Sequence, residues 1–434
     1  MTRRLPVTTV LLFFLSLSFA FGEGISVNAL DAGPYAPGSS IAGIFSISAA
    51  TNIRPDNTFE LYLSNASGSF ASEVRIGTFK GLYSTFVNGV IPTGTMPGAG
   101  YKLRIKSTNP AVVSTESTAF EIKAGAAVAA RITNRTPLSP SSTELFGNCS
   151  GRANYNFNME NASTTGAAVS ALITNELNGT VAPIINFNVS AKTYTAQQAH
   201  YTVFIKAVKD GIVGTRAYML VNNRPLTAFG TAGKTDVCLG DDPLSFNVIV
   251  NGNEGIGNNY PGTTYRVDWG DNSNDIYTLK DIIAASNEVK HTYMRDACGS
   301  KISLGNSTVY NAFGISIYAE SPYCGVVGTP ISTYARVSKR PTNRFDIPNT
   351  LCTNTPSIFV NTSTLGTNPD TNSPECETNK ATFTWYVDGE VVPDAIDKPI
   401  SYSLSYKFSP GTHTITLEST TSAACPPTPT TQTI

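Results

Sequence analysis

The chain has 434 residues, only 14% of them are charged, and its formal net charge is −1. Nucleic acid is not expected as a partner, because phosphate binding needs a clustered excess of Lys and Arg. The length exceeds what one hydrophobic core fills and predicts three or four domains. The 35 Gly and 26 Pro residues mark frequent turns, and the 19 Tyr and 21 Phe residues favour strands, so we expect an all-β fold.

The N-terminus has the pattern of an export signal. Arg3 and Arg4 precede an apolar segment at residues 10–19, and small residues follow as far as Gly22. The apolar run is shorter than the roughly 20 residues that a membrane span needs. We therefore expect a signal peptide over 1–22, a chain that is secreted or held on the outer cell surface, and no transmembrane segment after signal removal. An uncleaved anchor is the alternative.

Alternating segments mark the first module, residues 23–124. Residues 59–63 (FELYL) and 101–106 (YKLRIK) change between apolar and polar with period two, which is typical of half-buried antiparallel strands. The side chains expected to face inward are Phe59, Leu61, Leu63, Tyr101, Leu103 and Ile105. The outward row of Lys102, Arg104 and Lys106 is either a solvated face or a ligand-binding stripe.

Part of this module resembles a recurring Ig-like module of Bacteroidetes surface proteins. The matching residues are 63–70 (LSNASGSF), the dipeptide at 91–92 (IP) and 98–105 (GAGYKLRI) with Pro110 shortly after. The resemblance implies an Ig-like sandwich at the cell surface and indicates no ligand. The next module, 125–225, resembles no family, and its β-sandwich is expected from strand-like segments at 200–206 and 217–221 alone.

The third module contains the most specific motif. Residues 265–273 (YRVDWGDNS) are followed by His291 and Tyr293 in an H-x-Y motif, and then by the alternating segment 313–319. This combination resembles the PKD (polycystic kidney disease) domain, although Asn272 stands where Gly is usual. Asn tolerates the left-handed backbone of such a turn.

The PKD resemblance implies a definite packing arrangement. Trp269 would be a large buried ring, residues 271–273 would form a tight turn, and His291 and Tyr293 would pack and hydrogen-bond beside the ring. Residues 342–434 resemble a divergent second copy. That copy has FTWYVDG at 383–389 and YKFSPGTHTITL at 406–417, with Tyr406 and His413 exchanging the expected residue types.

The fold expected from these motifs is all-β, with tandem Ig-like and PKD-like antiparallel β-sandwiches. The domains are a signal peptide (1–22), an Ig-like sandwich (23–124), a sandwich of unrecognised family (125–225), a PKD-like domain (226–341) and a divergent PKD-like domain (342–434).

Seven Cys residues occur, and none forms a C-x-x-C pair. In an exported chain, disulfides are more common than metal ligation. Both PKD-like copies have one Cys near the start and one near the end, so Cys238–Cys324 and Cys352–Cys425 are expected to join the first and last strands of each copy. The sequence assigns no partner to the remaining Cys149, Cys298 and Cys376, and the odd count leaves at least one thiol that is free or paired in some unexpected way.

Three carboxylates, Asp268, Asp271 and Asp275, are candidate calcium ligands. Asp271, Ser273 and Asp275 place oxygen atoms at positions 1, 3 and 5, as calcium loops do, but the Gly and Glu of an EF-hand loop are missing. The alternative is an Asx-rich turn that hydrogen-bonds its own backbone. No other cofactor is expected.

No catalytic residue is predicted. The three His residues are His200, His291 and His413, and neither G-x-S-x-G nor H-E-x-x-H is present. We expect a non-enzymatic extracellular spacer or adhesion protein that binds protein or glycan. The alternatives are the accessory N-terminal part of a larger secreted hydrolase, or a structural component of a surface or gliding apparatus. No anchoring segment is recognised at the C-terminus, which indicates either a fragment or another route out of the cell.

Overall fold

The computed structural model describes residues 24–434 except 29, 49–51, 134–142, 152, 185–186, 188–190, 231, 233–234, 241–242, 327, 379 and 422–424. The expected export signal therefore lies outside the described residues. The chain divides into two compact units, which are Met1–Phe146, Asn156–Thr195 and His200–Leu220, and the remainder up to Ile434. In the part of the chain that the structure describes, no helix is long and apolar enough to cross a membrane.

The first unit is built from two β-sandwiches. The strands of the first sandwich are β1 (Ile25–Val27), β2 (Ser40–Ile47), β3 (Thr58–Leu63), β4 (Val74–Lys80), β5 (Phe86–Val90), β6 (Gly98–Tyr101), β7 (Leu103–Thr108), β8 (Ala111–Val113) and β9 (Phe120–Ile122). They pair in the orders β1-β2-β5, β4-β3-β7-β8 and β6-β9, all antiparallel. The two larger sheets enclose a core in which the rings of Phe45 and Phe59 lie 5.1 Å apart.

The alternation expected in β3 and β7 is confirmed, because the inward-facing residues are buried and their neighbours are not. The outward cations are not a free stripe. Lys102 pairs with Glu116 at 2.9 Å, and both Arg104 and Lys106 pair with Glu73. This row is a partly solvated face stabilised by ion pairs.

The second sandwich supplies the rest of the first unit. Its strands are β10 (Ile132–Thr133), β11 (Leu145–Asn148), β12 (Asn154–Asn161), β13 (Ala168–Asn175), β14 (Val181–Ile184), β15 (Ala191–Gln197), β16 (Ala199–Lys209) and β17 (Ile212–Asn222). They form sheets of order β10-β12-β15 and β11-β17-β16-β13-β14. The segments at 200–206 and 217–221 lie in β16 and β17 and are strands, as expected.

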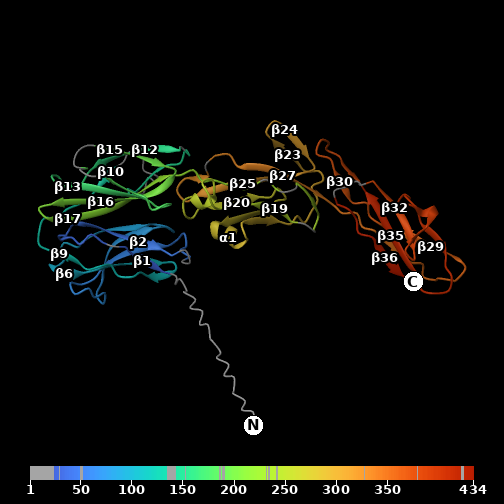
Figure 1. The fold of residues 1–434 in the computed structure, drawn as a ribbon, viewed down its shortest axis with the longest axis horizontal. Helices are drawn as coiled ribbons and strands as arrows, with labels where there is room; N and C mark the ends of the chain where they lie inside the picture. The colour runs from blue at the N-terminus through green and yellow to red at the C-terminus, as the bar shows by residue number, and fades with distance from the viewer. Residues whose placement is uncertain are drawn as a thin grey trace, which may run out of the picture. The chain divides into compact units, whose positions relative to one another are not determined.

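Two sheets of the first unit pack directly against each other. β2 and β5 on one side, and β16 and β17 on the other, carry buried residues at consecutive positions instead of alternate ones. A strand that is buried on both faces must be covered on both. Figure 1 shows β2 next to the layer of β16 and β17, and hydrogen bonds from Ala42 to Thr215 and from Asn88 to Ala217 join the two sheets, so the two sandwiches stack face to face through their inner sheets.

Asn88 of β5 connects the two inner sheets. Its Nδ2 donates to the carbonyl of Ala217 at 2.7 Å, and its Oδ1 accepts from the amide of Ala217 at 2.8 Å. Glu144 accepts a further bond from Asn88 and forms an ion pair with Arg216 at 2.7 Å. The side-chain amide of Asn88 thus supplies the hydrogen bonds that a neighbouring strand would otherwise make with Ala217.

The third sandwich begins the second unit. Its strands are β18 (Asp236–Cys238), β19 (Leu244–Asn247), β20 (Thr264–Asp268), β21 (Asn274–Thr278), β22 (Glu288–His291), β23 (Lys301–Leu304), β24 (Ser307–Tyr310), β25 (Phe313–Ser321), β26 (Gly325–Val326) and β27 (Ile331–Ser338). The main sheet runs β18-β27-β25-β20-β21, with β18 and β27 parallel, and the facing pair is β19-β22. Short helices η1 (Ile256–Asn258) and α1 (Leu279–Ala284) interrupt the connections, and Thr278 and Asp281 form a capping box at the start of α1.

The fourth sandwich completes the second unit. Its elements are β28 (Phe345–Asp346), β29 (Pro356–Asn361), β30 (Thr367–Pro369), β31 (Cys376–Thr378), β32 (Ala381–Val387), β33 (Glu390–Val391), η2 (Pro393–Ala395), β34 (Leu404–Lys407), β35 (Thr414–Thr421) and β36 (Thr430–Thr433). The facing sheets are β28-β29-β34 and β33-β32-β35-β36. The chain is therefore all-β and is built from tandem β-sandwiches, in which nearly all strand pairs are antiparallel.

Replacing Asn88 with Ala should destabilise the first unit. Both backbone groups of Ala217, which is fully buried, would lose their partner. Each unsatisfied buried group costs about 1–3 kcal/mol, so a decrease of roughly 2–5 kcal/mol in the free energy of unfolding is expected. Chemical denaturation of N88A measures this. The control is Asn178→Ala, because Asn178 lies in an exposed turn and accepts from the nearby Thr180. Equal stability of the two variants would contradict the assigned role.

Candidate functional site

A cluster of aromatic rings lies at the position of the PKD-like motif. Trp269 is fully buried, and the ring of His291 stacks on it with centroids 4.7 Å apart. The Tyr293 ring meets His291 edge-on at 4.6 Å, and its hydroxyl donates to the Trp269 carbonyl at 3.1 Å. Asn272 has a φ of 76°, so the turn uses the left-handed conformation that Asn tolerates. The packing implied by the resemblance is confirmed.

The three candidate calcium ligands do not converge. Asp271 binds His291 at 2.9 Å and accepts from Ser273, Asp275 accepts from the Trp269 indole at 2.7 Å, and Asp268 forms an ion pair with Arg266 at 3.3 Å. Among the described residues no group of three His, Cys, Asp or Glu side chains could hold a metal ion. The Asx-turn alternative fits, because Asp271 accepts from the Ser273 amide at 3.0 Å.

The cluster of Asp271, Ser273 and His291 differs in geometry from a hydrolase triad. In such a triad the carboxylate and the nucleophile contact opposite nitrogens of the imidazole. Here Nε2 of His291 faces both the Asp271 carboxylate, at 2.9 Å, and the Ser273 hydroxyl, at 3.5 Å. This group can stabilise a turn but is not arranged to relay a proton.

The fourth sandwich has a related arrangement. Trp385 is fully buried in its core, and Nδ1 of His413 lies 2.6 Å from the Asp388 carboxylate. A hydrogen bond to Asp388 raises the pKa of His413 above its ordinary value. His413 precedes β35, whereas Tyr406 lies in β34, which pairs with β29 as β22 pairs with β19. Tyr406 thus takes the place in the sheet that His291 has in the third sandwich.

The disulfide pairing expected from the sequence is wrong. The bonded pairs are Cys149–Cys324, Cys238–Cys425 and Cys298–Cys376, and Cys352 is free and exposed. The expected pairs assumed that each bond joins the two ends of one sandwich. Two of the actual bonds, Cys238–Cys425 and Cys298–Cys376, instead connect the third sandwich to the fourth.

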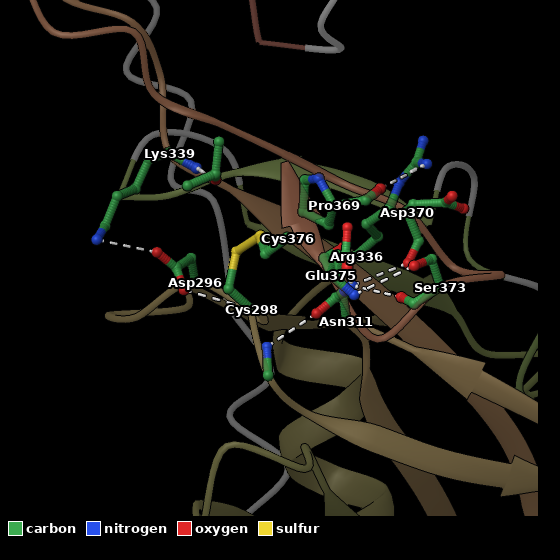
Figure 2. Close-up of a disulfide and its surroundings, with 12 residues drawn as sticks. Asp296, Cys298, Asn311, Arg336, Lys339, Pro369, Asp370, Ser373, Glu375 and Cys376 are labelled. Carbon is green, nitrogen blue, oxygen red and sulfur yellow. Dashed lines mark hydrogen bonds and ion pairs between the residues drawn. A yellow bond between two sulfur atoms is a disulfide. The ribbon is translucent and has the colours of Figure 1, made fainter. Parts of the chain in front are cut away.

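The joint between the third and fourth sandwiches is a cluster of polar contacts around a disulfide. Figure 2 shows Cys298–Cys376 with Lys339 and Asp296 paired at 3.0 Å on one side. On the other side the Arg336 guanidinium donates to the Pro369 carbonyl at 3.3 Å. The disulfide closes a separation of 78 residues, and in the chain-entropy model such a bond stabilises the fold by roughly 4 kcal/mol.

Asn311 is the centre of this joint. It is fully buried just before β25, and its Nδ2 lies 2.9 Å from the carbonyls of Asp370, Ser373 and Glu375. Figure 2 shows these three carbonyls converging on the amide. Its Oδ1 accepts from the Gly299 amide at 2.8 Å. Sequence reasoning missed Asn311, since a single Asn before a strand has no distinguishing pattern.

Comparison with known proteins gives structural similarity without a family. No family model matches the chain, and no curated protein is similar to it. Among solved structures, the ICAM-5 D1–D4 ectodomain fragment is 11% identical, with a TM-score of 0.33, covering 95% of this chain and 99% of that one. Sidekick-1 immunoglobulin domains 1–5 are 10% identical, with a TM-score of 0.26, covering 95% and 80%. The chicken CNTN1 FN1–FN3 domains are 10% identical, with a TM-score of 0.19, covering 72% and 97%.

Replacing Asp271 with Asn should lower stability in a pH-dependent way. Burial alone would raise the pKa of Asp271, but hydrogen bonds from Ser273 and His291 outweigh it and hold the pKa below its ordinary value. We expect D271N to lose about 1–3 kcal/mol at neutral pH. Because the folded-state pKa is below the unfolded one, this contribution is complete above the ordinary carboxyl range and is lost as the pH falls through the folded-state pKa.

Denaturation of D271N and wild type at a series of pH values measures the difference. Asp268→Asn is the matched control, because Asp268 and its partner Arg266 are both more than one-third exposed. A constant difference between D271N and wild type at all pH values would contradict the ionised role of Asp271.

Replacing Asn311 with Asp should weaken the joint between the third and fourth sandwiches more than an uncharged substitution at the same position. The carboxylate keeps the shape and tolerates the left-handed φ of 49°, but it points an acceptor at carbonyls that need a donor. We expect a loss of about 3 kcal/mol or more in the free energy of unfolding, and faster proteolysis within residues 370–375. Asn306→Asp, in the exposed turn between β23 and β24, is the control. If N311D were as stable as N306D, the side-chain amide would not hold the joint.

Proposed function

We propose that the chain is a non-enzymatic extracellular or cell-surface protein whose sandwiches act as a spacer and offer binding surfaces to protein or glycan. The observation that carries this proposal is the joint between the third and fourth sandwiches, which two disulfides and Asn311 hold. Contacts between domains of one chain normally permit relative motion. A spacer functions by limiting that motion, and covalent cross-links at a joint serve this purpose.

The cysteines also support an extracellular location. Disulfides persist in oxidising compartments and are rare in the cytosol, and six of the seven cysteines are bonded. The basic and apolar pattern over residues 1–22 supports the same location. We infer that the chain is exported before its cysteines pair.

We further propose that residues 226–341 and 342–434 are two PKD-like copies in a surface protein of Bacteroidetes type. The packing of His291 and Tyr293 on Trp269 supports the first copy. The buried Trp385, in the strand that pairs with β35, supports the second.

Thiol labelling of the exported chain tests its location. Protein purified from the medium or envelope and denatured without reductant is expected to take one alkylating label, at Cys352, and seven after reduction. Peptide mass spectrometry gives the position of the label. Labelling of all seven cysteines before reduction would mean a reducing compartment and would contradict the proposal.

The same preparation can be screened on glycan and cell-surface protein arrays. Saturable binding without chemical change of the bound molecule is the expected result. Saturable hydrolysis of a polysaccharide or a peptide would show an enzyme and overturn the non-catalytic assignment.

A further inference from the structure

A cleft lies between the two stacked sandwiches of the first unit. Its volume is about 480 Å³, within the 300–1,000 Å³ of typical small-ligand sites. One wall comes from the first sandwich, through β2 and the chain before β5, and the other from β13 and β16 of the second. Its lining includes Asp31, Ile44, Leu172, Glu176, Thr202 and Phe204.

Strand alternation explains why these side chains reach the cleft. Phe45 packs on Phe59 in the first core, so its neighbour Ile44 faces the other way. In β13, Ile173 is fully buried in the second sandwich, so Leu172 faces the cleft. The stacking of the inner sheets covers most of this face of the second sandwich but leaves it open at β13.

The cleft has an apolar side and an acidic side. Leu172 lies opposite Phe204 in the register of β13 and β16, and Leu172 is 42% exposed although it is apolar. Glu176, which directly follows β13, is half-buried and receives a hydrogen bond from Thr202. An apolar side chain in β13 faces the opening, and a carboxylate directly follows the same strand. This pair suits a ligand that has both an apolar part and a positive charge.

The charges around the cleft leave one carboxylate without a cation. Asp31 lines the cleft and pairs with Lys206 at 2.6 Å, so its charge is compensated. Among the residues that the structure describes, no Lys or Arg lines the cleft and no cation pairs with Glu176. Burial raises the pKa of Glu176 above its ordinary value, which shows that its charge is poorly solvated there. His200, on the neighbouring strand, does not supply a charge near neutral pH, because burial lowers its pKa to about 4.

We propose that this cleft binds a small organic amine, with the ammonium group at Glu176 and the hydrocarbon part against Leu172, Phe204 and Ile44. A cation restores the partner that the Glu176 carboxylate lacks, and charge-assisted hydrogen bonds of this kind are about twice as strong as neutral ones. The hydrocarbon part covers Leu172 and removes its apolar surface from water. This site is independent of the spacer role, because the joint lies in the second unit.

Isothermal titration of the exported chain with n-hexylamine at neutral pH, and ligand-observed NMR, test the proposal. n-Hexanol has the same hydrocarbon chain without the charge. We expect n-hexylamine to bind at least about tenfold more tightly than n-hexanol. Equal affinities for the two probes, or no saturable binding of n-hexylamine, would overturn the proposal.

Two variants locate the binding. Glu176→Gln keeps the shape and removes the charge, so it should reduce n-hexylamine affinity about tenfold and leave n-hexanol unchanged. Leu172→Trp should block both probes by filling the opening. Glu116→Gln, on the exposed side of the first sandwich, is the control for loss of a carboxylate. Thermal unfolding confirms that each variant folds, and unchanged n-hexylamine affinity in a folded E176Q would remove Glu176 from the site.

Discussion

Where two sandwiches of this chain meet within a unit, backbone amides and carbonyls lose their hydrogen bonds to water. Asparagine side chains supply the hydrogen bonds that the water would have made. Asn88 bonds both backbone groups of Ala217, and Asn311 reaches three carbonyls of the fourth sandwich. Within the third sandwich, Asn259 bonds both backbone groups of Leu226 in the same way, with both bonds at 2.8 Å. The Asn side chain carries one carbonyl acceptor and one amino donor group, so it can pair with a backbone amide and carbonyl as another strand would. Asn88 supports the stacking of the inner sheets in this way, and Asn311 supports the joint.

Much of the local structure followed from the sequence. Alternation correctly predicted which residues of β3, β7 and β25 face inward, because each of these strands has one face on its own core. The motif around Trp269 correctly predicted the stacked His291, because both residues are needed to fill one space between two sheets. Such predictions succeed where the determining neighbours belong to a single sandwich.

The sequence did not predict the features whose residues come from two sandwiches or turn toward unexpected partners. The carboxylates Asp268 and Asp275 are close in sequence to Asp271, but the hairpin turns each toward a different partner. The cleft was missed because no strand was predicted from the sequence around Leu172 and Glu176, and no motif marks the faces through which two sandwiches stack. The one available signal was the nearly continuous apolar run in β16 and β17, which indicates a strand covered on both faces.

The disulfides constrain the order of events during folding. None of the three bonds joins cysteines that are neighbours in chain order, since Cys238 and Cys298 both lie between Cys149 and its partner Cys324. Pairing on a first-come basis would trap the wrong bonds. The native pairs form directly only if the third sandwich folds with its cysteines reduced and docks the fourth before oxidation; otherwise wrong bonds must be reshuffled by thiol exchange. In either case the final pairing follows from which strands the folded sandwiches bring together, and the cross-links then preserve that arrangement.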